Sequence, residues 1–246
     1  MSFLDRFNLG HGYRKYFCIH AASTEALRDE VFRIRHEVYC EDLGFEAVRA
    51  DGRERDDYDD QSVHCLLRSR NDPPAPVGCA RLVLTREGDR DQPLPFERTC
   101  AASIDRSIID PARLPRERIA EVSRLAVRAA YRRRKTDVDH RLIHDEDFRS
   151  DAQPRFPYIP ISLYLGAVAL AERHGIDTLF VLTEPRLAAH FARLGVEIRQ
   201  IGAPVEHRGT RIPSMMDVRA IIADMRILLR PIWRAVREDI ERGAEG

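Results

Sequence analysis

Residues 118–127 read RIAEVSRLAV, and this stretch decides the fold class. Its length and its content of Ile, Val, Leu and Ala predict a β-strand. Successive side chains of a strand point to opposite faces, so Glu121 and Ser123 share one face with Ile119, Leu125 and Val127. A carboxyl group on an apolar face is unfavourable unless it is paired or used. We therefore expect a central strand that carries a functional group.

Further strand and helix signals lie on both sides of this stretch. The apolar runs at 63–69 and 76–85 flank the turn-rich RNDPPAP, which predicts an antiparallel hairpin. Downstream, ISLYLGAVALAERHG at 161–175 is apolar on nearly all sides and stops at a glycine, as a buried helix would. A strand is predicted at 177–183, DTLFVLT. This order predicts an α/β fold with a mixed central sheet flanked by helices.

Weaker patterns complete the expected domain. Apolar residues at helical spacing predict helices over 23–40 and 184–195, and short strands are expected near 197–201 and 214–218. The last segment, 218–242, predicts one long amphipathic helix kinked at Pro231. We expect one domain over residues 1–217, a charged surface insertion or lid at about 132–157 within it, and a C-terminal helical extension over 218–246.

Composition argues against several classes of protein. Lys+Arg and Asp+Glu both number 40, so no global field attracts nucleic acid. The five cysteines contain no C-x-x-C pair, which argues against a disulfide framework or a cysteine zinc site. The sequence also lacks the G-x-S-x-G, P-loop, H-E-x-x-H and G-x-G-x-x-G motifs. It has no apolar run long enough for a spanning helix and no secretion signal, so we expect a cytoplasmic protein.

Charged residues stand at unusual places in the expected elements. They are Arg35 beside a helix stripe, Asp56 and Asp59 in a long polar loop, Arg81 in an apolar strand, and Glu121, Ser123 and Arg124 in the central strand. In a regular strand Glu121 and Arg124 would point to opposite faces. Either a β-bulge brings both into one site, or Arg124 supports the helix and loop that cover it. The spacing leaves both open.

The order of these residues resembles that of acyl-homoserine lactone synthases. The matching pieces are R-x-x-V-Y with Gly-Phe (Arg35, Val38, Tyr39, Gly44, Phe45), D-x-x-D (Asp56, Asp59), V-G-C-x-R-L (Val77 to Leu82) and E-x-S-R (Glu121 to Arg124). They cover about the first half of the chain. In the second half, a strand followed by TEPRLAAHFARLGV resembles the strand and helix that close the GNAT fold. The resemblance implies a GNAT-like acyltransferase domain.

Departures from that pattern favour a particular subgroup. Phe45 stands where the lactone synthases usually have tryptophan, and the charged insertion and C-terminal helix are additions. The chain is more similar in these respects to long-chain N-acyl amino acid synthases and to acyltransferases associated with exosortase, PEP-CTERM sorting systems. This implies transfer of a fatty acyl group from an acyl carrier protein or coenzyme A thioester to the amine of an amino acid or related small molecule. Lactone synthesis from S-adenosylmethionine, and a non-catalytic acyl- or carrier-binding regulator, remain alternatives.

The resemblance and the chemistry together suggest roles for single residues. An α-amino group has a pKa of roughly 8, so acyl transfer benefits from a carboxylate base, and Glu121 is the candidate. The resemblance adds Ser123 and Arg124 to the catalytic set. It implies that the acceptor site is formed by Arg35, Tyr39, Phe45, Asp56, Asp59 and Arg81. Plainer interpretations remain open: Arg35 as a surface arginine lying along its helix, Tyr39 and Phe45 as core or loop-anchoring aromatics, and Asp56 and Asp59 as part of a solvated loop.

The donor and partners are less constrained by the sequence. The stretch where GNAT enzymes hold the pyrophosphate of coenzyme A reads VRAAYRRRKTD and lacks glycine. A basic run could instead attract an acidic acyl carrier protein; it consists of Arg132, Arg133, Arg134 and Lys135. We expect no metal or other cofactor, although His140, His144, Asp145 and Asp147 leave a minor metal-dependent alternative. A homodimer, and membrane contact through the C-terminal helix, are both left open.

Overall fold

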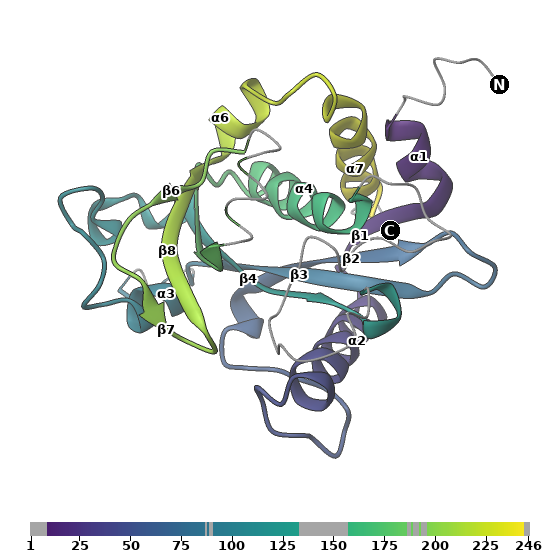
Figure 1. Cartoon of the computed structure of the whole chain (residues 1–246), viewed down its shortest axis with the longest axis horizontal. Helices are drawn as coiled ribbons and strands as arrows, with labels where there is room; N and C mark the ends of the chain where they lie inside the picture. Colours follow the sequence, from purple (N-terminus) through teal and green to yellow (C-terminus); the bar gives the residue numbers. More distant parts are fainter. Residues whose placement is uncertain are drawn as a thin grey trace.

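The computed structural model of the chain describes residues 9–86, 88, 91–132, 157–185, 188, 192 and 196–243. Their eight strands form one mixed sheet in the order β1-β2-β3-β4-β5-β8-β6, with β7 paired to β8 (Figure 1). The strands are β1 Phe17–Ala21, β2 Ser62–Ser69, β3 Pro76–Leu84, β4 Ile119–Val127, β5 Thr178–Thr183, β6 Arg199–Gln200, β7 Val205–Glu206 and β8 Thr210–Asp217. Only β4 and β5 pair in parallel; the other neighbours are antiparallel. The predicted mixed sheet is confirmed.

Helices cover both faces of this sheet. They are α1 Leu9–Tyr16, α2 Glu25–Arg35, α3 Pro95–Thr99, α4 Tyr158–Arg173, α6 Val218–Ala223 and α7 Arg230–Arg242. Figure 1 shows α4, α7 and α1 on one face and α2 on the other. Helix α2 begins after Thr24, whose side chain accepts a hydrogen bond from the Leu27 N–H, and continues as a π-helical turn, His36–Asp42. The helix predicted over 23–40 is therefore present, but its last turns are wider.

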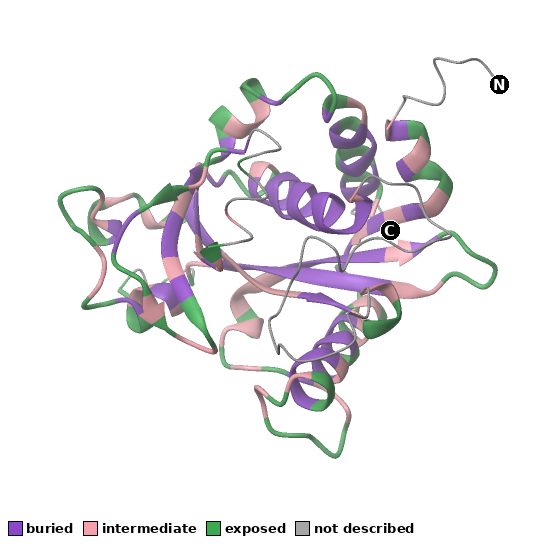
Figure 2. Cartoon of the chain, in the orientation of Figure 1, coloured by how far each residue is buried: buried purple, intermediate pink, exposed green. Residues whose placement is uncertain are grey.

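The largest hydrophobic core lies on the α4 side of the sheet. Helix α4 is buried on nearly all sides because it is enclosed by the sheet below and α7 above (Figure 2). Ile232, Trp233 and Val236 of α7 belong to the same core as the strands. Helix α7 also contacts α1, where the Tyr13 hydroxyl donates to Asp239 Oδ2 at 2.7 Å. The same Asp239 oxygen accepts from the backbone N–H of Ile19 in β1 at 3.3 Å.

The C-terminal segment corrects one prediction. Residues 218–242 do not form a single kinked helix, because α6 ends at Ala223 and α7 begins at Arg230. Pro231 lies in the first turn of α7, where a missing backbone N–H leaves no hydrogen bond unmade. Helix α1 and strand β1 were not predicted at all. The predicted helix over 184–195 and the charged insertion lie mostly outside the described residues.

The cysteines and the apolar helices can be compared with what the composition predicted. All five cysteines are free. Within the described ranges, no helix has the length and apolar character needed to cross a membrane.

Gly78 marks a close contact between β3 and β4. A Cβ at this position would lie 2.5 Å from the backbone carbonyl oxygen of Ala126, which cannot move without disturbing β4. We expect Gly78→Ala to lower the free energy of unfolding by about 1–3 kcal/mol, measured by urea denaturation. Gly243→Ala is the matched control, because the nearest atom is 3.5 Å away and φ is −69°. Equal urea midpoints for the parent and Gly78→Ala would contradict the close contact.

Candidate functional site

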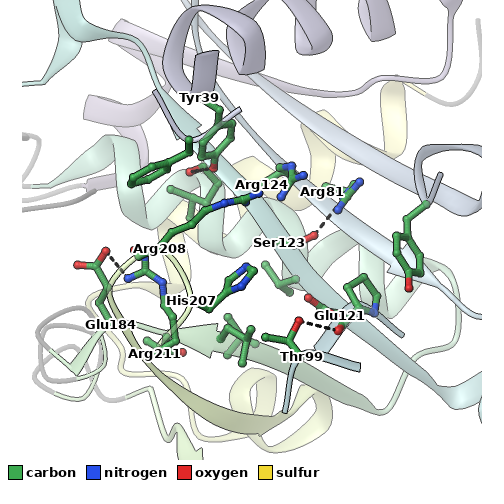
Figure 3. A pocket seen from close by; sticks show the side chains of 18 of the residues that line it. Tyr39, Arg81, Thr99, Glu121, Ser123, Arg124, Glu184, His207, Arg208 and Arg211 are labelled. Atoms are coloured by element: carbon green, nitrogen blue, oxygen red, sulfur yellow. Dashed lines mark hydrogen bonds and ion pairs between the residues drawn. The ribbon is translucent and has the colours of Figure 1, made fainter. Parts of the chain in front are cut away.

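A cavity lies where β4 and β5 separate. The two strands pair from Ile119 and Thr178 only as far as Val122 and Val181, although β4 continues to Val127. A cavity of about 340 Å³ opens beside the unpaired part of β4. Its walls come from β4, β5, α3, α4, the β7–β8 hairpin and the loop after α2. Figure 3 shows these side chains converging on one space.

A β-bulge places the charged residues of β4 along this cavity. Cys79 pairs with Ala126 and Arg81 with Ser123, so two steps along β3 oppose three along β4. Arg124 takes up the extra residue with a φ of +48°, in the left-handed region that a residue with a side chain rarely adopts. Glu121, Ser123 and Arg124 consequently all line the cavity. Of the two arrangements that the sequence left open, the bulge is present, and Arg124 also contacts the covering loop.

Glu121 is the buried acid of the cavity. Its side chain is only 4% exposed, and Oε2 accepts a hydrogen bond of 2.6 Å from the backbone N–H of Phe96. Burial raises the pKa of Glu121 to about 7, against the opposing effects of the Phe96 N–H and of Arg81 and Arg124. A carboxyl group with this pKa can take up or release a proton near neutral pH.

The Phe96 N–H comes from a helix that the sequence analysis did not identify. Helix α3 begins at Pro95, with Glu97 Oε2 accepting from the Leu94 N–H at 2.8 Å. The Phe96 ring stacks on Phe180 of β5, with centroids 4.3 Å apart. The stretch LPFERT carried a signal for this helix, since proline in the first turn followed by glutamate is typical of a helix start.

Behind the cavity, Arg35 is fully buried between two carboxylates. Its Nε lies 2.5 Å from Glu54 Oε2, and its Nη1 and Nη2 lie 2.6 and 2.9 Å from the two oxygens of Asp59. The interpretation of Arg35 as a surface arginine is wrong, because its exposed fraction is 0%. Neither Arg35 nor Asp59 is among the residues that line the cavity, so the structure places both behind it, and their role in substrate binding stays a prediction.

Two further arginines connect this pair to β4 and to the covering loop. Arg81 Nη1 contacts Asp56 Oδ1 at 2.6 Å and Asp59 Oδ1 at 3.1 Å, and its Nε donates to the Ser123 hydroxyl at 3.0 Å (Figure 3). Arg124 Nη2 contacts Asp56 Oδ2 at 2.9 Å. The same nitrogen lies 3.2 Å from both Glu46 and Glu54.

Together with Arg208, which also contacts Glu46, these residues form what we call the ion-pair frame. Its members are Arg35, Arg81, Arg124, Arg208, Glu46, Glu54, Asp56 and Asp59. Four positive and four negative charges balance, so the frame is neutral. Burial alone would raise the pKa of Asp59, but Arg35 and Arg81 outweigh it and lower that pKa well below the usual value. The long polar loop is thereby fixed over the sheet.

Tyr39 and Phe45 line the cavity beside this frame. The Tyr39 hydroxyl donates to the carbonyl oxygen of Leu125 at 2.8 Å, next to the bulge. Burial raises the pKa of Tyr39 to about 12, which keeps this donor protonated. The Arg124 guanidinium lies 5.6 Å from the centre of the Tyr39 ring. The predicted placement of both aromatic side chains at the site agrees with this geometry.

The β7–β8 hairpin supplies site residues that sequence reasoning missed. His207, Arg208 and Arg211 line the cavity, with Arg211 Nη1 2.5 Å from Glu184 Oε1 (Figure 3). Burial lowers the pKa of His207, and nearby Arg208 and Arg211 lower it further, which favours the neutral form of the ring. The signal in the sequence was HRGTR, three basic residues around a glycine turn.

The remaining predicted site residues lie near or beyond the edge of the described chain. Arg132 forms an ion pair with Asp42. Arg133, Arg134 and Lys135 lie outside the described residues, as do His140, His144, Asp145 and Asp147. Among the residues whose placement is described, no group of three or more His, Cys, Asp or Glu side chains could hold a metal ion.

Comparisons with known proteins agree with this architecture. Residues 34–139 match the family described as "Acetyltransferase (GNAT) domain". No curated protein sequence matches the chain. The fold is similar to that of BjaI, a CoA-dependent acyl-homoserine lactone synthase solved with SAM and isopentyl-CoA. The two are 22% identical, with a TM-score of 0.58 over 88% of this chain and 89% of BjaI.

Two other solved structures are similar to a comparable extent. LasI, an AHL synthase, is 15% identical, with a TM-score of 0.59 over 85% of this chain and 95% of LasI. FeeM, an N-acyl amino acid synthase from uncultured soil microbes, is 16% identical, with a TM-score of 0.55 over 87% of this chain and 97% of FeeM. At such identities the likeness establishes the fold, so the GNAT-like fold expected from the sequence is confirmed. The exosortase-associated subgroup stays a prediction.

Proposed function

We propose that this protein is an N-acyltransferase that moves a fatty acyl group from a thioester to the amine of an amino acid or a related small molecule. The observation that carries the proposal is Glu121, a buried carboxyl group with a pKa of about 7 on the wall of the cavity between β4 and β5. The GNAT-like fold supports the reaction class.

The reaction balances with the groups present. The amine nitrogen attacks the thioester carbonyl carbon, an N–C bond forms, and the C–S bond breaks. Glu121 accepts the proton that the amine loses, directly or through a water molecule, and the departing thiolate takes up a proton. An α-amino group has a pKa of roughly 8, so a base with a pKa near 7 is well matched to it.

We assign stabilisation of the oxyanion to backbone N–H groups of β4 beyond Val122. Within the described part of the sheet, β4 has no strand partner on the β5 side after that residue. The bulge at Arg124 reorients the peptide groups there. Donors that are already oriented before the reaction stabilise the developing negative charge at little cost in reorganisation.

The lining of the cavity suggests what holds each substrate. The apolar side chains Leu163, Val181, Leu182, Ile198 and Met216 offer a surface for the acyl chain. The polar lining residues Asp56, His207 and Arg208 are suited to the charged groups of the acceptor. The donor carrier, acyl carrier protein or coenzyme A, stays a proposal. Arg132 is the described member of the predicted docking run.

Mass spectrometry of reaction products tests the proposal. Purified protein is incubated with acyl-carrier-protein and acyl-CoA thioesters of several chain lengths, together with the common amino acids and S-adenosylmethionine. We expect new N-acylated species from the parent protein and almost none from Glu121→Gln. A lactone formed only when S-adenosylmethionine is present would favour the lactone synthase alternative. No acylated product from a folded parent protein would favour the non-catalytic acyl-binding regulator.

A further inference from the structure

The turn between α6 and α7 exposes two large apolar side chains. Ile227 is 82% exposed and Leu228 is 57% exposed. Figure 1 shows the segment that joins α6 to α7 at the outer end of the helical layer. The residues just before and after this segment, Met225 and Leu229, are buried in the main core. The turn is therefore anchored to the core at both ends, and Ile227 and Leu228 between these anchors point into solvent. Such exposure of adjacent apolar residues is typical of a contact surface.

Positive charge gathers around these two side chains. Residues 218–234 contain four arginines, Arg219, Arg226, Arg230 and Arg234, and one acidic residue, Asp224, which gives a net charge of +3. The whole chain has a formal net charge of zero. All four arginines are exposed. Among their local contacts, Arg219 pairs with Asp177 at 3.1 Å and Arg230 donates to the Met225 carbonyl oxygen at 3.2 Å.

We propose that this turn binds an anionic lipid surface. Ile227 and Leu228 would enter the boundary between headgroups and acyl chains, and the surrounding arginines would contact lipid phosphates. Exposed apolar residues surrounded by long cationic side chains match a membrane interface, where lipid phosphates lie above the apolar acyl chains. The inference does not depend on the proposed acyl transfer, because neither the turn nor its arginines line the cavity.

Other occupants of this surface fit less well. A second copy of the chain would bring two surfaces of net charge +3 together, which is unfavourable. An acyl carrier protein must deliver its thioester where β4 and β5 separate, near Val181 and Thr183. Helix α6 instead starts directly after Asp217, which pairs with Thr178 at the other end of β5. The turn thus belongs to the opposite end of that strand.

Vesicle co-sedimentation of the full chain tests the proposal. The probes are vesicles of phosphatidylcholine alone and vesicles in which about one third of the lipid is phosphatidylglycerol. We expect the parent protein to bind the anionic vesicles at low salt, and the double variant Ile227→Asp, Leu228→Asp to bind about ten-fold less. Arg234→Glu should weaken binding as well, and so should about 300 mM salt. Val48→Asp, at a residue that is 69% exposed elsewhere, is the matched control and should bind like the parent.

Each contrary outcome overturns the proposal. If the parent does not sediment with anionic vesicles, or the double variant sediments equally well, the turn is not a lipid contact. Equal binding to neutral vesicles would remove the role of the arginines. Light scattering tests whether the turn instead binds a second copy of the chain. If the parent is a dimer, the double variant is a monomer and neither binds vesicles, the surface is a dimer contact. Thermal unfolding of all variants confirms that they are folded.

Discussion

Replacing Glu121 with glutamine is expected to lower kcat/KM for acyl transfer by about 10²–10⁴-fold, the range typical for removal of a general base. Glutamine keeps the shape of the side chain and can still accept the Phe96 N–H hydrogen bond, so the cavity should persist. The measurement is the initial rate of thiol release from an acyl thioester. Glu117→Gln is the control, since Glu117 is exposed just before β4 and should leave the rate unchanged.

The pH dependence of the parent should report the same group. Only the ionised carboxylate accepts a proton, so with the concentration of unprotonated acceptor amine held constant kcat/KM should rise with pH through about 7, the pKa of Glu121, and then level off. In Glu121→Gln this limb should vanish. A parent profile without an inflection between about pH 6 and pH 8 would mean that another group, or no group, acts as the base.

The stability of the parent should fall over the pH range in which its activity rises, and Glu121→Gln should be the more stable protein. The folded-state pKa of Glu121 lies above its usual value of 4.5 because burial disfavours the charged form. Stability linked to this group is therefore complete below its unfolded pKa and is lost as pH rises through about 7. Glutamine cannot ionise, so Glu121→Gln should gain about 1–3 kcal/mol over the parent between pH 5 and pH 8. Urea denaturation at both pH values measures this gain.

Arg35→Met is expected to give the largest loss of stability, about 3–5 kcal/mol, because it leaves Glu54 and Asp59 buried without their main partner. Methionine retains much of the side-chain length, so the loss reflects charge more than volume. Urea denaturation at pH 7 is the measurement. Arg33→Met is the matched control on the same helix: it removes an exposed pair with Asp29, which contributes about 0.5 kcal/mol or less.

The stability difference between the parent and Arg35→Met should also depend on pH in the acid range. The pKa of Asp59 is lowered in the folded parent, so the stability that it contributes is present above its unfolded value of about 4 and is lost as pH falls. The difference in stability between the parent and Arg35→Met should therefore narrow below about pH 4. A constant difference from pH 7 to pH 3 would show that Arg35 acts through packing alone.

The parts of the fold that were predictable are those with a strong local pattern. Strand β4 and helix α4 follow directly from apolar runs and from a glycine stop. Pro231 was misread because its position within a helix depends on where the helix begins, which the periodicity alone does not fix. Helix α1 and strand β1 were missed because both are short and have polar residues among their apolar ones, so neither shows a clear periodicity.

The site divides in the same way. Glu121 stood out because it interrupts an apolar strand, and Arg81 for the same reason. Arg35 could not be placed from the sequence, since its burial depends on Glu54 and Asp59 folding back from a loop about 20 residues away. His207 lines the cavity, and the Phe96 N–H meets Glu121, only through the tertiary arrangement of a hairpin and a short helix. Local patterns do not contain such contacts.

The contact between α1 and α7 has a consequence for synthesis on the ribosome. Asp239 accepts hydrogen bonds from the Tyr13 hydroxyl and the Ile19 N–H, which lie 226 and 220 residues before it in the sequence. The nascent chain can therefore form these contacts of α1 and β1 only after α7 has left the exit tunnel. Until then the apolar surface of α4 that α7 covers is open to chaperones and proteases. A stop codon shortly before α7 would yield a chain with a nearly complete cavity and an unclosed core, a target for degradation.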